Sequence, residues 1–142
     1  MLVTNHTYDV IGSYVPTKEM GGGAGLKYAA STIIFLTKSK EKEGTDLVGN
    51  IIKCEAKKSR FTQEGSKVAT RLYFDERGLD KYYGLIELGE KYGVFTRVGN
   101  RIRIGESNVY PKSILGDPEK YFTDEVMAKL EEAAQQEYSY GN

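Results

Sequence analysis

Apolar and polar residues alternate along much of the first half of the chain, with the two-residue period of strands that have one buried face. Leu2 to Thr4 is a short apolar segment, and residues 31–38 have a solid apolar centre. Two further stretches, 48–57 and 67–74, each place their apolar residues on one face: Ile52, Cys54 and Ala56 in the former, Val68, Thr70, Leu72 and Phe74 in the latter. The pattern therefore predicts four strands, the last two half-buried.

The segments between these strands have turn and loop character. Residues 7–20 show little periodicity and contain Gly12 and Pro16, so we expect a mobile loop. The run Gly21–Gly23 then leads into Ala24, Leu26 and Tyr28, which predicts a glycine-rich turn followed by a short helix. Residues 39–44 are interpreted as an exposed hairpin loop and 57–60 as a basic turn.

After Gly78 the pattern changes to a spacing of three to four residues, which predicts a helix through about Tyr92. Residues 94–98 and 101–104, joined by Gly99-Asn100, predict a short hairpin. Thr123 is the expected N-cap of a last helix running to about Tyr138. The change of pattern predicts two domains, 1–78 and 79–142, of which the second is a small α+β domain.

Composition excludes several classes of protein. The chain has 142 residues, and its apolar runs are much shorter than the roughly 18 residues of a membrane span. One histidine and one cysteine, Cys54, give no metal-ligand pattern and no internal disulfide. No signal-peptide pattern is seen at the start. We expect a soluble cytoplasmic protein with no membrane partner and no metal site.

The zero net charge conceals an uneven distribution. Residues 117–142 carry a net charge of −5, so the other residues carry +5. A mildly basic body with an acidic tail is typical of proteins that bind a polyanion and limit access to it. The alternative is a solvated acidic surface helix.

The glycine run is a candidate anion site, because free backbone N–H groups converge at a helix start. A plain turn is the alternative. Neither nucleotide fingerprint is present: no G-x-x-x-x-G-K-[ST] string occurs, and Leu26 stands where the dinucleotide pattern needs its third glycine. We therefore expect that this chain does not bind ATP as a P-loop protein by itself.

Three other features are candidate binding groups. Lys57, Lys58 and Arg60 form either a phosphate clamp or a solvated turn. His6, which follows Asn5, has either a structural role or a ligand-sensing one. The loop 7–20 contains one cation and several apolar or aromatic side chains that could stack on bases, as in proteins that bind single-stranded nucleic acid: Tyr8, Ile11, Tyr14, Val15 and the cation Lys18.

At Asn5-His6-Thr7-Tyr8, at residues 20–25 (MGGGAG) and at Lys58-Ser59-Arg60, the sequence resembles the C-terminal part of RecA-type recombinases, and in particular the UvsX-like phage recombinases. The resemblance implies an α/β fold. It consists of the C-terminal half of a RecA-like core, a mixed sheet of about four strands with a short helix, followed by the small α+β domain.

The resemblance also implies roles for individual residues. Asn5 and His6 match the pair that senses the ATP γ-phosphate. Residues 7–20 match the second DNA-binding loop, in which Ile11 matches an apolar wedge between bases. Gly22 and Gly23 match glycines that hold a DNA phosphate, and Tyr8, Tyr14 and Lys18 lie in the same DNA-binding segment. Lys58 and Arg60 match cations that reach into the ATP site of a neighbouring subunit.

The family's Walker A lysine, its Mg²⁺ ligands and its first DNA loop have no counterpart in this sequence. We therefore expect a recombinase fragment that is no ATPase alone. With ATP and Mg²⁺, the full-length protein would form a filament on single-stranded DNA and promote strand exchange in the host cytoplasm. The alternative is a free-standing DNA-binding or filament-regulating interaction module. A small enzyme using His6 is a third reading. The chain alone is expected to self-associate.

Overall fold

The computed structural model describes residues 1–139. The chain begins with an antiparallel hairpin of β1 (Thr7–Asp9) and β2 (Lys18–Met20), followed by the short helix α1 (Gly23–Ala29). Only residues 10–17 form a loop, because the ends of the predicted loop pair as strands. The predicted strand at Leu2 to Thr4 is wrong: Leu2 is 94% exposed, and the segment pairs with no strand among residues 1–139.

The centre of the molecule is a four-stranded antiparallel sheet in the order β3 (Thr32–Glu43), β4 (Asp46–Ser59), β5 (Lys67–Tyr73) and β6 (Leu79–Asp80). The α/β class is confirmed, but the fourth strand of the sheet is β6 and not the predicted Leu2–Thr4, and every pair in this sheet is antiparallel. β3 extends to Glu43 and β4 begins at Asp46, so most of the predicted loop at 39–44 is strand. Lys57 and Lys58 also belong to β4 and not to a turn.

The C-terminal part contains α2 (Leu85–Lys91), a three-stranded sheet, and three more helices. The sheet consists of β7 (Thr96–Val98), β8 (Arg101–Ile104) and β9 (Ser107–Val109). The other helices are α3 (Pro111–Gly116), α4 (Pro118–Tyr121) and α5 (Asp124–Tyr138). The predicted helix at 79–92 begins only at Leu85, because residues 79–80 pair with β5 and Gly84 has a left-handed φ of 81°.

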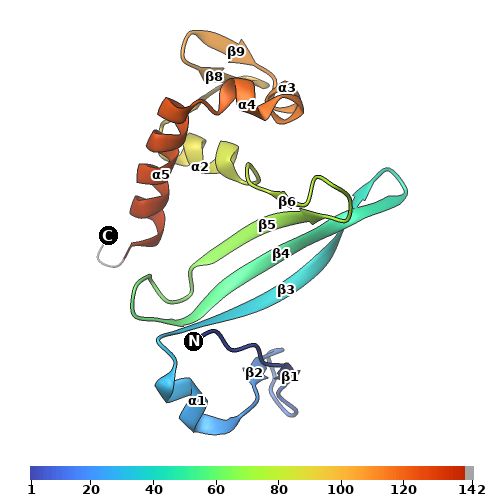
Figure 1. The fold of residues 1–142 in the computed structure, drawn as a ribbon, viewed down its shortest axis with the longest axis vertical. Helices are drawn as coiled ribbons and strands as arrows, with labels where there is room; N and C mark the ends of the chain where they lie inside the picture. Colours follow the sequence, from blue (N-terminus) through green and yellow to red (C-terminus); the bar gives the residue numbers. More distant parts are fainter. Residues whose placement is uncertain (140–142) are drawn as a thin grey trace.

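These C-terminal elements enclose the main hydrophobic core, whose buried members are Ile86, Phe95, Ile102, Ile114, Phe122 and Leu130. Figure 1 shows this part above the four-stranded sheet, on the side of β6, and the N-terminal hairpin with α1 below the sheet, on the side of β3. β6 lies just beyond residue 78 and still belongs to the large sheet. The boundary between 1–78 and 79–142 stays a prediction. Among residues 1–139, no helix has the length and apolarity needed to cross a membrane.

Candidate functional site

The tip of the β1–β2 hairpin carries apolar and aromatic side chains that contact almost nothing. Ile11 is 100% exposed and Tyr14 106%, relative to a free residue. The loop backbone is nevertheless held: Val10 N–H donates to the Thr17 carbonyl at 2.9 Å, and the Thr17 hydroxyl donates to the Val15 carbonyl at 2.9 Å. The hairpin therefore presents Ile11 and Tyr14 to solvent from an ordered turn.

The predicted sensing pair is joined to the glycine run. Asn5 Nδ2 donates to the Gly21 carbonyl at 2.7 Å, and Gly21 N–H donates to the His6 carbonyl at 3.1 Å. Asn5 Oδ1 also accepts from His6 N–H at 2.8 Å. The structure thus brings Asn5, His6 and the glycines together at the base of the hairpin, although the Asn5 and Gly21 positions are 16 residues apart in sequence.

Three successive glycines allow this arrangement for two different reasons. Gly21 is buried, and a Cβ at that position would lie within 3.4 Å of three atoms of the Tyr8 ring and hydroxyl. Gly22 and Gly23 have φ angles of 92° and 72°, a region that L side chains avoid. Tyr8 therefore packs over the glycine run, while Gly22 and Gly23 make the turn into α1.

Lys58 and Arg60 lie at the other end of α1, which is about 10 Å long. Lys58 Nζ donates to the carbonyls of Lys27 and Tyr28 at 2.7 and 3.1 Å, and so caps the last turn of the helix. Arg60 is exposed, and its backbone N–H donates to the Ser31 carbonyl at 3.2 Å. Lys58 lines the same hollow as Met20 and Gly23, but within residues 1–139 no hydrogen bond joins Lys58 or Arg60 to Asn5 or His6.

Ser59, between these cations, has a role that the sequence analysis missed. It is 6% exposed, and its Oγ accepts from Phe61 N–H, Thr62 N–H and the Thr62 hydroxyl at 3.0–3.1 Å. Ser59 therefore shapes the turn that displays Arg60. A serine that follows a strand and precedes a turn is a weak signal for such a bond.

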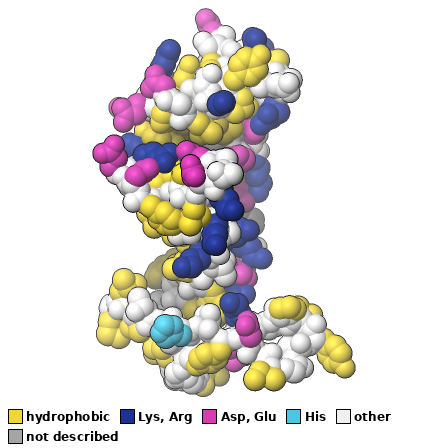
Figure 2. Space-filling model, turned by 90° about the vertical axis from the view of Figure 1, so that its right-hand side faces the viewer, with side chains coloured by type: hydrophobic (Ala, Val, Ile, Leu, Met, Phe, Trp, Pro, Cys, Tyr) yellow, Lys and Arg dark blue, Asp and Glu magenta, His cyan; other side chains and the backbone are white. Residues whose placement is uncertain are grey.

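The charges near the hairpin are few. Lys18 Nζ is 4.0 Å from Asp9, and Lys27 Nζ is 3.5 Å from Glu19. Figure 2 shows Lys and Arg side chains concentrated over the middle of the molecule, at the level of the four-stranded sheet. The end with the hairpin shows mostly hydrophobic and uncharged side chains there. Exposed lysines of β3 and β4 lie in this middle part: Lys38, Lys40, Lys42, Lys53 and Lys57.

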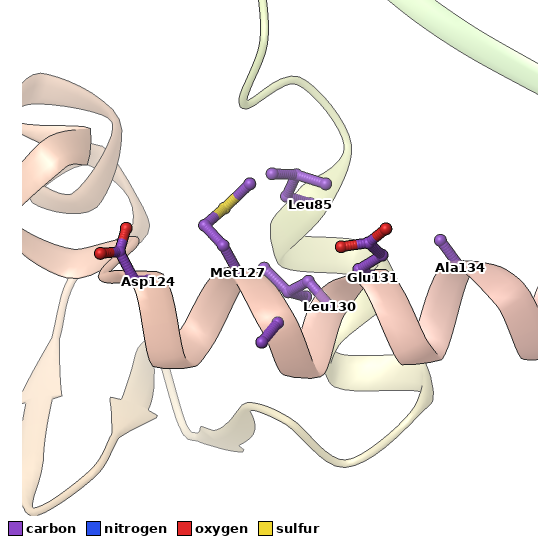
Figure 3. A pocket seen from close by; sticks show the side chains of 7 residues that line it. Leu85, Asp124, Met127, Leu130, Glu131 and Ala134 are labelled. Atoms are coloured by element: carbon purple, nitrogen blue, oxygen red, sulfur yellow. The ribbon is translucent and has the colours of Figure 1, made fainter.

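The hollows on the described surface include one at each end of the molecule. One lies beside α1 and is lined by Met20, Gly23, Ala24, Lys58 and their neighbours. The other lies between α2 and α5, where Asp124 and Glu131 flank an apolar floor of Leu85, Met127 and Leu130 (Figure 3). None of the predicted site residues lines this second hollow.

The side chains and backbone groups at this site are of kinds that bind a ligand. Within residues 1–139, no group of three or more His, Cys, Asp or Glu is placed to hold a metal ion. The His6 ring is exposed, and no hydrogen bond to a nucleophile is found for it among these residues. Exposed aromatic rings, an apolar tip and the backbone of a glycine turn are groups that contact bases and phosphates.

Two curated proteins are similar to this chain. The recombination and repair protein of Enterobacteria phage T4 is 34% identical over 99 residues, which are 70% of this chain and 25% of that protein. Protein RecA of Thermotoga neapolitana is 29% identical over 80 residues, which are 56% of this chain and 22% of that protein. The chain thus spans about a quarter of the length of these curated relatives. No protein-family model matches it.

Proposed function

The chain is related to the RecA-type recombinases, and from this relationship we propose that it takes part in DNA recombination and repair by binding single-stranded DNA through the N-terminal hairpin. The observation that carries the proposal is the fully exposed pair Ile11 and Tyr14 on an ordered turn. Water-exposed apolar and aromatic side chains are unfavourable unless they meet a partner, and a base offers an aromatic face to each of them.

The other predicted DNA-binding residues support a path for the DNA strand along the hairpin. Tyr8 packs beside Gly21 and is still 57% exposed, so its ring is available at the base of the hairpin. Gly22 and Gly23 follow Gly21 and are exposed, so their backbone is open to solvent beside the Tyr8 ring. We propose that bases stack at the hairpin tip while a phosphate approaches Gly22 and Gly23, with Lys18 as the nearest cation on the hairpin.

ATP and Mg²⁺ are implied by the resemblance, and two of the residues expected to meet ATP already have partners within the chain. The Asn5 amide is engaged by the Gly21 carbonyl, and the Lys58 ammonium is engaged by two carbonyls of α1. We propose that Asn5, His6, Lys58 and Arg60 act on ATP only as part of an assembly in which other polypeptide supplies the phosphate-binding loop. Filament formation and strand exchange belong to that same assembly.

Fluorescence anisotropy with labelled oligo-dT tests the DNA-binding proposal. Loss of one stacking ring costs about 1–3 kcal/mol, so Tyr14→Ala should weaken binding by roughly 5- to 150-fold. The matched control is Tyr110→Ala, which removes a tyrosine that is 50% exposed and stacks under Arg101 in the C-terminal part. Equal affinity of the Tyr14→Ala variant and the unaltered chain would contradict the proposal.

A further inference from the structure

Helix α1 is held weakly by its own sequence. It has seven residues, none of them is buried, and two of them, Gly23 and Gly25, are glycine. Its N-cap makes no side-chain hydrogen bond. An isolated helix of this length is marginal in water, and glycine destabilises a helix interior relative to alanine. The position of α1 therefore depends on contacts with other parts of the chain.

Lys58 supplies such a contact at the end of the helix. Its Nζ donates to the carbonyls of Lys27 and Tyr28 at 2.7 and 3.1 Å. The last carbonyls of a helix have no partner within the helix, and a cation there also interacts favourably with the helix dipole. Lys58 belongs to β4 and is paired with Ile33 of β3, so its backbone is fixed in the four-stranded sheet. Lys58 thus attaches α1 to that sheet.

The end of α1 also contacts the proposed DNA-binding segment. Lys27 Nζ is 3.5 Å from a carboxylate oxygen of Glu19 on β2. A Cβ placed on Gly22 would lie 3.5 Å from Cδ2 of Leu26, so the Leu26 side chain packs beside the glycine turn. Lys27, which Lys58 holds, and its neighbour Leu26 therefore contact the hairpin and the turn. A displacement of this end of α1 would disturb both.

A direct contact between Lys58 and DNA is the alternative role. Lys58 lines the hollow beside α1 together with Met20 and Gly23, close to the proposed position of the phosphate. However, an ammonium has three N–H donors, and two of those of Lys58 already serve α1. The geometry therefore favours a role in positioning. The two roles also differ in salt dependence, because only a phosphate contact releases a counterion from the DNA.

We propose that Lys58 is a positioning residue for DNA binding: it caps α1 and thereby fixes the Gly22–Gly23 turn and the base of the hairpin, without contacting the DNA. This role rests on the proposed function, in which the hairpin and the glycines bind single-stranded DNA. It is separate from the ATP contact proposed for Lys58, because the cap is formed within this chain. Loss of the ammonium should therefore weaken DNA binding in the absence of nucleotide.

Anisotropy titrations of the full chain with labelled oligo-dT at two salt concentrations test this role. Lys58→Met removes the ammonium but keeps a long side chain, and it should weaken binding roughly 2- to 10-fold, the effect of losing about one hydrogen bond. The dependence of binding on salt should not change. Lys58→Arg should restore the affinity, because a guanidinium can also donate to carbonyls. The control Lys53→Met removes an exposed lysine of the same strand and should leave the affinity unchanged.

Lys18→Met provides the comparison for a phosphate contact, since its loss should reduce the salt slope by roughly 0.7. A slope reduced by the same amount in Lys58→Met would overturn the positioning role and leave the proposed function standing. An affinity of Lys58→Met equal to that of the unaltered chain would do the same. If the unaltered chain did not bind oligo-dT, the proposed function and this role would both be wrong.

Amide hydrogen exchange of the free chain is a readout that needs no DNA. Lys58→Met should exchange faster than the unaltered chain at residues 27–30, whereas Lys53→Met should not. Unchanged exchange at the buried core residues Ile102 and Ile114 shows that the variant is folded. Equal exchange at residues 27–30 in Lys58→Met and the unaltered chain would overturn the positioning role, whatever the affinity for DNA.

Discussion

At the scale of single residues, the glycine run shows how backbone conformation decides which side chain is tolerated. Gly22 and Gly23 occupy the left-handed region, whereas Gly25 lies within α1 without a positive φ and has open space where a Cβ would lie. The same residue type therefore has a conformational role at two positions and none at the third. Within one short segment, glycine-to-alanine substitutions should have opposite effects.

We expect Gly22→Ala to cost about 1–2 kcal/mol, because alanine is strained at positive φ. Gly25→Ala should be neutral or stabilise α1 by about 0.5–1 kcal/mol, because it removes backbone freedom from the unfolded chain. Amide hydrogen exchange in α1 measures both effects: faster exchange is expected in the first variant and equal or slower exchange in the second. Equal exchange rates in both variants would show that the turn is not strained by a side chain.

The sequence predicted these local features unevenly. The glycine turn, the helix after it and the Thr123 cap were predictable because their signals lie within a few neighbouring residues; the Thr123 hydroxyl accepts from Val126 N–H at 3.4 Å. The Asn5–Gly21 bond and the contacts of Lys58 with α1 join positions 16 to 31 residues apart. No periodicity encodes such pairs, so these contacts emerged only in three dimensions.

At the scale of elements, Arg71 holds three strands together. Its guanidinium binds Asp80 on β6 and Glu41 on β3 and lies over the rings of Tyr73 and Tyr83, and its side chain is 19% exposed. Arg77 makes comparable ion pairs with Asp75 and Glu43, but its side chain is 43% exposed. Solvent screening weakens the second set of contacts far more than the first.

Arg71→Ala should therefore lower the free energy of unfolding by about 2–3 kcal/mol, since it leaves partly buried carboxylates without a partner. Arg77→Ala is the matched control and should cost less than about 1 kcal/mol. Urea denaturation followed by circular dichroism measures both values. Equal losses in the two variants would mean that the position of Arg71 between the strands is unimportant.

The end of α5 is attached to α2 by Glu137. Hydrogen bonds from the Lys91 ammonium and the Tyr92 hydroxyl hold the pKa of this carboxyl below its ordinary value of 4.5. A carboxyl whose pKa is lower in the folded state stabilises the fold at pH values above 4.5. That contribution is lost as the pH falls through the lowered pKa of the folded state.

Glu137→Gln should therefore reduce stability at pH 7 and have a smaller effect near pH 3, because the contribution of the carboxylate decreases as the pH falls below 4.5. Thermal unfolding at the two pH values measures the difference. Glu125→Gln is the control for an exposed pair within one helix turn, because Glu125 binds Lys129, four residues along α5. A Glu137→Gln penalty that is equal at both pH values would contradict the ion-pair explanation.

At the scale of the whole molecule, the chain consists of one well-filled core and two regions that lack one. The C-terminal elements bury Ile102 and Ile114 completely. In contrast, Leu36 of the sheet is 64% exposed and Ile11 of the hairpin is 100% exposed. Secondary structure was largely predictable because alternation and capping are local. Which faces become buried was not predictable, since burial depends on what packs against each face. The sheet is antiparallel because each of its strands follows the preceding one through a short connection.

The small number of cations on the hairpin limits how many DNA phosphates it can contact. The hairpin has Lys18 as its cation, and the nearest larger group of exposed lysines is on the sheet. For a single strand, the logarithm of the binding constant falls by roughly 0.7 per phosphate contact for each tenfold rise in salt. We expect a slope of about 1–2, which corresponds to two or three contacts. Anisotropy titrations at two salt concentrations measure it, and a slope near 5 would place the strand on the lysines of the sheet instead.

The central claim is that the N-terminal hairpin is the surface that contacts single-stranded DNA. The most direct test is an NMR titration of the isotope-labelled chain with oligo-dT, following each backbone amide. The account predicts progressive shifts for residues 8–18 and for Gly22 and Gly23, with unchanged signals from the core residues Ile102 and Ile114. Shifts confined to the sheet or to the C-terminal part, with the hairpin signals unmoved, would contradict it.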